Sequence, residues 1–212
     1  MTQPVVLVAD DHPLFRSAMK VATLRASPSA VVIEAGSIAE TLAVLRSQPR
    51  IDLILLDLRM PDATGFSGVA TVHAERPDTP IIVVSAADDD EAAGARRYGA
   101  AAFLSKSAPL PEIEATVRAA LGGVRAPLGA TNDDETDAMA ASIAGLTPAQ
   151  LKVLIAMLGG RLNKQIAHDV GISEATVKAH LTVIFRKLGV QNRTQAVIAA
   201  RALGLDAVDR AA

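Results

Sequence analysis

Short hydrophobic runs alternate with amphipathic segments through the first 121 residues of the chain. Runs of about four apolar residues are typical of strands buried on both faces of a parallel sheet, and the segments between them carry apolar residues at helical spacing. The predicted strands are Val5–Val8, Val31–Ile33, Leu53–Leu56, Ile81–Val84 and Ala101–Leu104. The predicted helices cover residues 13–25, 37–45, 66–75, 90–97 and 111–121. This order predicts an α/β fold with an open, doubly wound, five-stranded parallel sheet.

The chain after residue 144 has helical spacing only, which predicts a separate all-α domain of four short helices. The first helix begins with a capping box at Thr147–Gln150, and Asn163 is expected to cap the second. The second helix ends at Gly171 and Ser173 caps the third after a short turn, which makes a helix-turn-helix. The fourth helix covers about residues 193–203. The third helix carries one apolar stripe, formed by Val177, Leu181, Ile184 and Leu188.

A segment rich in Gly, Pro and acidic residues separates these two patterns, at residues 122–144. Such a composition is typical of a linker, although the part near Thr136–Ile143 also has helical spacing. We therefore divide the chain into a sheet domain at residues 1–121, a linker at residues 122–144 and a helical domain at residues 145–212.

Charge is distributed unevenly along the 212 residues, whose net charge is −2. Residues 1–144 hold 12 Lys and Arg against 19 Asp and Glu, which is a net charge of −7. Residues 145–212 hold 9 Lys and Arg against 4 Asp and Glu, which is a net charge of +5. An acidic first part and a basic second part predict different partners, with a polyanion as the partner of the second.

Composition also indicates where the protein works. The chain has no Cys, which excludes disulfides and thiolate metal sites and fits a reducing cytosol. No uninterrupted apolar stretch approaches the roughly 18 residues of a membrane span. The segment Met1–Asp11 lacks the basic start of a signal peptide. We therefore expect a cytoplasmic protein with no membrane partner.

Polar side chains follow four of the five predicted strands, at the points where these strands end. They are Asp10 and Asp11 for the first strand, Asp57 for the third, Ser85 for the fourth and Lys106 for the fifth. Because ligands of such folds bind at the carboxyl ends of the strands, we expect all five at one rim. Three close carboxylates repel one another by roughly 1–4 kcal/mol per pair at about 4 Å, so the cluster predicts a divalent cation, Mg²⁺. This cation, the Ser85 hydroxyl and the Lys106 ammonium would prepare Asp57 to accept a phosphoryl group.

Residues 4–121 resemble the receiver domains of two-component response regulators, which have a flavodoxin-like fold. The resemblance rests on the motifs "VLVADDHPLFR", "LILLDLRMP", "IIVVSA" and "AAFLSK". It implies that Asp57 takes a phosphoryl group from the phosphohistidine of a sensor histidine kinase. The implied Mg²⁺ ligands are Asp10, Asp11, Asp57 and the backbone carbonyl of Arg59. Ser85 and Lys106 are implied to bind the phosphoryl oxygens, and Phe103 either turns inward on activation or packs in the core.

Several positions depart from the usual receiver pattern. The loop reads Asp62-Ala63-Thr64-Gly65, where relatives usually carry an acid just before the glycine. Tyr98 stands where a small residue is typical. Arg59 and Ala87 occupy the two positions that in this family tune how long the phosphorylated state lasts.

The outer face predicted for the third helix of the C-terminal domain is polar and basic, which suits contacts to a DNA groove and to phosphates. The strings "ISEATVKAHL" and "IFRKLGVQNRTQAV" resemble the LuxR/NarL-type DNA-binding domain across residues 145–203. The resemblance implies that the third helix enters the major groove of promoter DNA and that fourth helices pair in a homodimer on phosphorylation. The implied contacts to base edges are Lys178, Ala179 and Thr182. The implied phosphate contacts are Lys164, Thr176, His180, Lys187, Arg193 and Thr194, with packing as an alternative role for His180.

Two other functions fit part of the pattern. A phosphohydrolase of the haloacid dehalogenase type needs a second Asp two residues after its nucleophile, and this chain has Arg59 there. A receiver used only as an interaction module typically lacks one of the acids or the lysine, whereas this chain keeps them all. We therefore expect a phosphorylation-controlled, sequence-specific transcription regulator, and not an enzyme with an external substrate. In the unphosphorylated state we expect the N-terminal domain to lie near the third helix and to compete with DNA for it.

Overall fold

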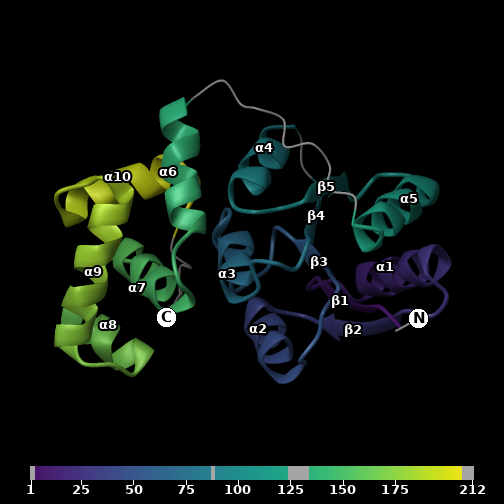
Figure 1. The fold of residues 1–212 in the computed structure, drawn as a ribbon, viewed down its shortest axis with the longest axis horizontal. Helices are drawn as coiled ribbons and strands as arrows, with labels where there is room; N and C mark the ends of the chain where they lie inside the picture. The colour runs from purple at the N-terminus through teal and green to yellow at the C-terminus, as the bar shows by residue number, and fades with distance from the viewer. Residues whose placement is uncertain (1–2, 87–88, 124–133, 207–212) are drawn as a thin grey trace.

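The computed structural model describes residues 3–86, 89–123 and 134–206. A five-stranded parallel sheet with helices on both faces is followed by a group of helices (Figure 1). The strands are β1 (Val5–Ala9), β2 (Val31–Ala35), β3 (Leu53–Asp57), β4 (Ile81–Ser85) and β5 (Ala102–Ser105). Their spatial order is β2-β1-β3-β4-β5, with all neighbours parallel. This is the doubly wound order of flavodoxin-like folds, so the predicted fold class is confirmed.

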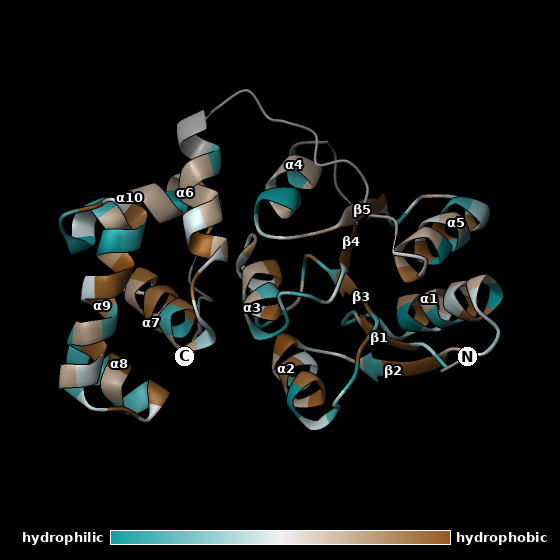
Figure 2. Ribbon diagram, in the orientation of Figure 1, coloured by the Kyte–Doolittle hydropathy of each residue, from teal (hydrophilic) through white to brown (hydrophobic). Residues whose placement is uncertain are grey.

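The hydrophobic runs of the sequence form the centre of the sheet, whose strands are largely brown in Figure 2. Every residue of β3 and β4 is buried, and so are Val6–Ala9 of β1. The strands β2 and β5 are only partly buried, because each lies at an edge of the sheet. Burial on both faces is therefore confirmed for the three central strands only.

Two layers of helices cover the sheet. On one face lie α1 (Pro13–Ala26) and α5 (Leu110–Leu121), which bury Met19, Ala22, Ile113 and Val117 against it. On the other face lie α2 (Ile38–Ser47), α3 (Ser67–Glu75) and α4 (Asp89–Arg97). All five predicted helices are present. Each observed end lies within two residues of the predicted end.

The C-terminal domain contains α7 (Pro148–Leu158), α8 (Asn163–Val170), α9 (Glu174–Leu188) and α10 (Arg193–Ala202). The capping box at Thr147–Gln150 and the Ser173 cap are present, and the apolar stripe of α9 is buried. The helix-turn-helix prediction is therefore confirmed. One detail is wrong, because α8 begins after Leu162, whose N–H donates to the Gln165 side chain at 2.8 Å, and Asn163 is already helical.

The helix α6 (Asp134–Ala144) lies between the two domains. It contacts α3 and α4 on one side and α9 on the other, and α3 packs directly against α7. The buried core on the α2–α4 side of the sheet continues through Ala140 and Ile143 into the C-terminal domain. The predicted helical part of the linker is therefore present. Residues 124–133 of the predicted linker lie outside the described residues, and so does Ala87, which the sequence analysis singled out. The division into two domains and a linker stays a prediction.

The C-terminal turn (Leu203–Asp206) also lies against the N-terminal domain. Leu205 forms an isolated antiparallel bridge with Gly65 in the loop between β3 and α3, and the N–H of Phe66 donates to the Gly204 carbonyl at 3.1 Å. Tyr98, fully buried at the end of α4, stacks on Phe66 with ring centroids 5.7 Å apart. Gly204 has a φ of +74°, and a Cβ there would lie 3.0 Å from the Phe66 ring, so glycine suits this contact.

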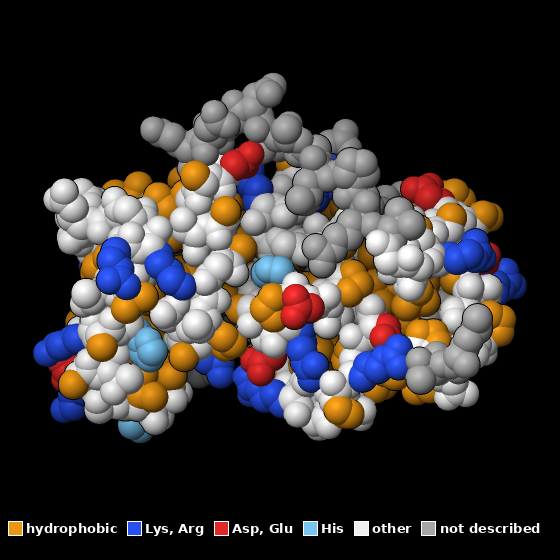
Figure 3. All heavy atoms as spheres, in the orientation of Figure 1, with side chains coloured by type: hydrophobic (Ala, Val, Ile, Leu, Met, Phe, Trp, Pro, Cys, Tyr) orange, Lys and Arg blue, Asp and Glu red, His pale blue; other side chains and the backbone are white. Residues whose placement is uncertain are grey.

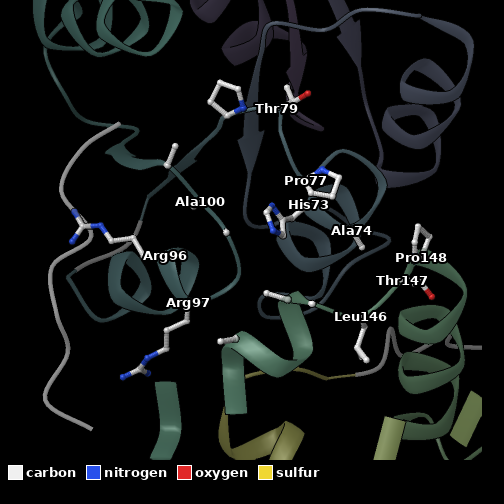
Figure 4. A pocket seen from close by; sticks show the side chains of 16 residues that line it. His73, Ala74, Pro77, Thr79, Arg96, Arg97, Ala100, Leu146, Thr147 and Pro148 are labelled. Atoms are coloured by element: carbon white, nitrogen blue, oxygen red, sulfur yellow. The ribbon is translucent and has the colours of Figure 1, made fainter. Parts of the chain in front are cut away.

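A cavity of about 870 Å³ lies between the domains (Figure 4). His73, Arg96 and Arg97 line it from the N-terminal domain, and the connection Leu146–Pro148 lines it from the other side. Arg97 also forms an ion pair with Asp137 of α6, with 2.7 Å between Nε and Oδ1. Polar and apolar contacts thus both contribute to the junction.

No single helix among the described residues is long and apolar enough to cross a membrane. The segments Asp137–Ala144 and Pro148–Leu158 meet the length and composition criterion only together, and their axes are bent by 119°.

Candidate functional site

The predicted rim residues lie together at the carboxyl ends of the strands. Asp57 and Ser85 are the last residues of β3 and β4, and Asp10 directly follows β1. All three are buried, with at most 3% of their surface exposed. Lys106 follows β5, and its Nζ lies 2.7 Å from Oδ2 of Asp10 and 2.8 Å from Oδ2 of Asp57. One ammonium group therefore offsets part of the charge of two buried carboxylates.

The environment of Lys106 favours its charged form. Burial alone would lower the pKa of the Lys106 ammonium, but its hydrogen bonds to Asp10 and Asp57 outweigh burial and raise the pKa above the ordinary value. The Nζ atom also lies 4.6 Å from the ring centroid of Phe15, which is a cation–π contact. Lys106 is thus a fixed positive charge at neutral pH.

Asp11 completes an acidic cluster at the same rim. Ligand atoms of Asp10, Asp11, His12 and Asp57 lie within 4.8 Å of one another, which is close enough to surround one cation. Oδ1 of Asp11 is buried and has no hydrogen bond of acceptable geometry from the described residues, although Nδ1 of His12 lies 2.6 Å away. Carboxylate oxygens in this arrangement fit a hard divalent cation.

Arg59 and Ser85 lie on the α4 side of the rim. The N–H of Arg59 donates to Oδ1 of Asp57 at 3.2 Å, and its guanidinium forms an ion pair with Glu91 of α4. The hydroxyl of Ser85 also donates to Glu91. Phe103 on β5 is partly buried and packs against the core on the α2–α4 side of the sheet.

Two acids beside the site were missed in the sequence. Glu91 gave no local signal, because only the packing of α4 brings it to Ser85. Asp62 could have been found in the sequence, because the loop that contains it differs from the usual receiver pattern. The structure explains the acid: its carboxylate accepts hydrogen bonds of 2.8 Å from the N–H groups of Ile38 and Ala39, at the start of α2.

The predicted DNA contacts are grouped on the C-terminal domain, mostly on α9. Figure 3 shows Lys and Arg side chains over these helices, on the left of the view. His180 is half-buried. The exposed members are Lys164, Thr176, Lys178, Ala179, Thr182, Lys187 and Thr194.

Two basic residues among the predicted phosphate contacts donate hydrogen bonds to backbone carbonyls of the C-terminal domain. The guanidinium of Arg193 donates to the carbonyls of Met157 and Arg161 at 3.0 and 2.6 Å, and so satisfies backbone groups at the end of α7. Nζ of Lys187 donates to the carbonyl of Gly145 at 2.8 Å. A role for either residue in DNA contact stays a prediction.

The described residues of the N-terminal domain do not cover the exposed face of α9. This helix packs against α6, α7, α8 and α10, and in Figure 1 it lies on the side of the C-terminal domain that faces away from the sheet. The expectation that the N-terminal domain lies near the third helix and competes with DNA is therefore wrong for this structure. The N-terminal domain contacts α6, α7 and the C-terminal turn instead.

A doubly wound sheet with an acidic rim, joined to a helix-turn-helix, defines a response regulator that binds DNA. Residues 6–118 match the family described as "Response regulator receiver domain", and residues 144–200 match "Bacterial regulatory proteins, luxR family". The chain belongs to the LuxR family of response regulators, which are transcription regulators and not enzymes.

Full-length relatives support this assignment. The chain is 37% identical to the "Glycerol metabolism activator" of Pseudomonas putida over 207 residues, covering 92% of this chain and 94% of the relative. It is 34% identical to the "Nitrate/nitrite response regulator protein NarP" of Escherichia coli over 202 residues, covering 91% and 92%. A solved structure of the RcsB response regulator from Salmonella typhimurium matches with a TM-score of 0.53 at 19% identity, covering 95% and 100%. At that identity the last likeness concerns the fold alone.

Proposed function

We propose that this chain is a transcription regulator whose DNA binding is controlled by phosphorylation of Asp57. The observation that carries the proposal is the Lys106 ammonium between the buried carboxylates of Asp10 and Asp57, in a chain that also has a helix-turn-helix. Burying two carboxylates at one rim is costly. A role of these charges in phosphoryl transfer would explain why the chain keeps such a costly cluster.

The proposed phosphoryl donor is the phosphohistidine of a sensor histidine kinase. A carboxylate oxygen of Asp57 attacks the phosphorus atom, the P–N bond breaks, and its electron pair returns to the imidazole nitrogen. Lys106, already 2.8 Å from Asp57, offsets charge on the phosphoryl oxygens. Ser85 would donate its hydroxyl to one of these oxygens, and Phe103 would turn inward.

The proposed metal is Mg²⁺, held by Asp10, Asp11, Asp57 and the backbone carbonyl of Arg59. The buried Oδ1 of Asp11, which lacks a hydrogen bond from the described residues, supports this ligand set. When bound, the ion would supply positive charge beside the transferring phosphoryl group. The residues of the chain hold the acceptor carboxylate still and keep it buried.

The proposed recognition helix is α9, which would lie in the major groove of promoter DNA. Lys178, Ala179 and Thr182 are the proposed contacts to base edges, and they lie on its exposed face. Lys178 forms an exposed ion pair with Glu174 at 3.2 Å, which DNA could replace at little cost. The proposed phosphate contacts are Lys164, Thr176, His180, Lys187, Arg193 and Thr194.

The two sites are proposed to communicate through the C-terminal turn. The loop that begins at Leu58, directly after Asp57, ends at Gly65 and Phe66, which contact this turn. Phosphorylation replaces the single negative charge of the Asp57 carboxylate with a phosphoryl group that carries about −1.5 to −2 at the start of this loop, and a shift of the loop would release the turn. The freed C-terminal domains would pair in a homodimer, whose two α9 helices read half-sites about one helical turn apart. The proposed location is the cytoplasm, where kinase and promoter are both accessible.

Incubation with Mg²⁺ and acetyl phosphate, followed by mass spectrometry, tests the acceptor. We expect an acid-labile mass gain of one phosphoryl group on Asp57, absent in Asp57→Asn and absent without Mg²⁺. Asp62→Asn is the matched control, because it removes a carboxylate of the adjoining loop that caps α2 and should still be labelled. Labelling that persists in Asp57→Asn would place the acceptor elsewhere.

A further inference from the structure

Glu91 of α4 connects two residues of the phosphorylation site. Its Oε2 accepts a hydrogen bond of 3.1 Å from the hydroxyl of Ser85, and its Oε1 lies 3.0 Å from the guanidinium of Arg59. Ser85 is fully buried, so its hydroxyl cannot exchange this partner for bulk water. Arg59 lies at the surface, where its guanidinium forms an ion pair with the Glu91 carboxylate.

A serine hydroxyl has one proton and therefore donates one hydrogen bond at a time. Donation to Glu91 excludes donation to a phosphoryl oxygen on Asp57. The bond to Glu91 is charge-assisted, and such bonds are roughly twice as strong as bonds between neutral groups. Ser85 must give up this bond before it can serve the phosphoryl group.

The Glu91 charge also borders the approach to the acceptor. Glu91 lines a cavity of about 510 Å³ together with Asp11 and Arg59, and Gly204 and Asp206 of the C-terminal turn line the same cavity. A negatively charged phosphodonor that enters this cavity meets three carboxylates, those of Asp11, Glu91 and Asp206. Arg59 offsets only part of this charge, because its side chain is 71% exposed and therefore screened by water.

We propose that Glu91 is a positioning residue that holds Ser85 in the orientation of the unphosphorylated state and thereby slows phosphorylation of Asp57. This inference rests on the proposed function, because it assigns Glu91 a role in that same reaction. Removing the charge of Glu91 should free the Ser85 hydroxyl and speed the gain of the phosphoryl group.

The substitution Glu91→Gln tests this role with little structural change. A glutamine oxygen can still accept from the buried Ser85 hydroxyl, but the bond is no longer charge-assisted. We expect the initial rate of labelling by acetyl phosphate with Mg²⁺ to rise about three- to tenfold. The matched control is Glu75→Gln, which also removes one acid from an ion pair with an arginine, Arg46, but on α3 away from Ser85. Its labelling rate should equal that of the wild-type chain.

A double substitution separates positioning from simple charge repulsion. In a Ser85→Ala background the hydroxyl is gone, so Glu91→Gln should then change the labelling rate by less than about twofold. A full three- to tenfold rise in that background would overturn the positioning role, because charge alone would explain it. An unchanged rate in the single variant Glu91→Gln would overturn it as well. Absence of labelling in the wild-type chain would instead overturn the proposed function, and the inference with it.

Discussion

The hydroxyl group of Tyr98 donates a hydrogen bond of 3.1 Å to the backbone carbonyl of Leu203. Tyr98 directly follows α4 in the N-terminal domain and is fully buried, and Leu203 begins the C-terminal turn. The family resemblance leads us to expect a small residue at this position, which could not reach across the junction. The departure from the family pattern therefore supplies a contact between the two domains of this chain.

Replacing Tyr98 by Phe should loosen the junction selectively. The variant keeps a ring to stack on Phe66 but leaves the Leu203 carbonyl without this donor, at a cost of about 1–2 kcal/mol. Because the N–H of Phe66 donates to Gly204 across the junction, its hydrogen exchange should become faster. The amide of Leu55, in the centre of the sheet, is the internal control and should keep its rate. Equal protection of Phe66 in both proteins would contradict a role for this hydroxyl.

Tyr98 also predicts a loss of stability in alkali. Burial raises the pKa of the Tyr98 phenol above its ordinary value of 10.0. Above about pH 10 the unfolded chain loses the phenol proton while the folded chain keeps it. The contribution of Tyr98 to the free energy of unfolding is therefore complete below about pH 10 and declines as the pH rises. Lys106 adds to this decline, because its pKa in the folded chain is raised too.

Urea unfolding at about pH 9 and about pH 11 measures this decline. Tyr98→Phe should lose less free energy of unfolding between the two pH values than the wild-type chain loses. The same loss in both proteins would assign the effect to Lys106 and other groups.

Replacing Lys106 should lower the stability of the fold, because the carboxylates of Asp10 and Asp57 would then repel each other. Lys106→Ala leaves Asp10 and Asp57 buried without their cation, and we expect a destabilisation of about 2–3 kcal/mol. Lys20→Ala is the control, because it breaks an exposed ion pair with Glu34 and should cost at most about 1 kcal/mol. Mg²⁺ should raise the melting temperature of Lys106→Ala more than that of the wild-type chain, since it replaces the lost charge. A similar loss of stability in both variants would mean that repulsion between Asp10 and Asp57 contributes little.

Two lysines of α9 should affect DNA binding differently. Lys178→Ala should relax sequence preference, because Lys178 is predicted to face base edges. Lys187→Ala should weaken all sequences alike and reduce the salt slope by about one. It should also lower stability by about 1 kcal/mol, because Nζ of Lys187 donates to the Gly145 carbonyl. Titrations of selected and random DNA over a salt series measure both effects. If both variants lost the same affinity on both DNAs, the assignment of Lys178 to bases and Lys187 to phosphates would be contradicted.

The sequence was sufficient for most features that depend on neighbouring residues, although the cap expected at Asn163 was wrong. Apolar runs located the strands, and the rule that parallel strands end at one rim predicted that Asp10, Asp57 and Lys106 lie together, as they do in the fold. The cap at Ser173 located the start of α9 in the same way.

Features that depend on packing between distant segments could not be read from the sequence. Glu91 reaches Ser85 only because α4 packs beside the end of β4. The family resemblance implied a phosphate contact for Arg193, and only the fold shows that its guanidinium also donates to the carbonyls of Met157 and Arg161. Charge alone also predicted that the acidic domain would cover α9, whereas the apolar core through α6 and α7 determines how the domains pack.

The DNA affinity of the intact chain before and after phosphorylation of Asp57 tests the proposed function most directly. Operator DNA selected from random sequences would be titrated by fluorescence anisotropy at fixed salt and Mg²⁺, with and without acetyl phosphate. We predict at least about tenfold tighter binding by the phosphorylated wild-type chain, and no response to acetyl phosphate in Asp57→Asn. Unchanged wild-type affinity, with Asp57 shown by mass spectrometry to carry the phosphoryl group, would contradict control of DNA binding by phosphorylation.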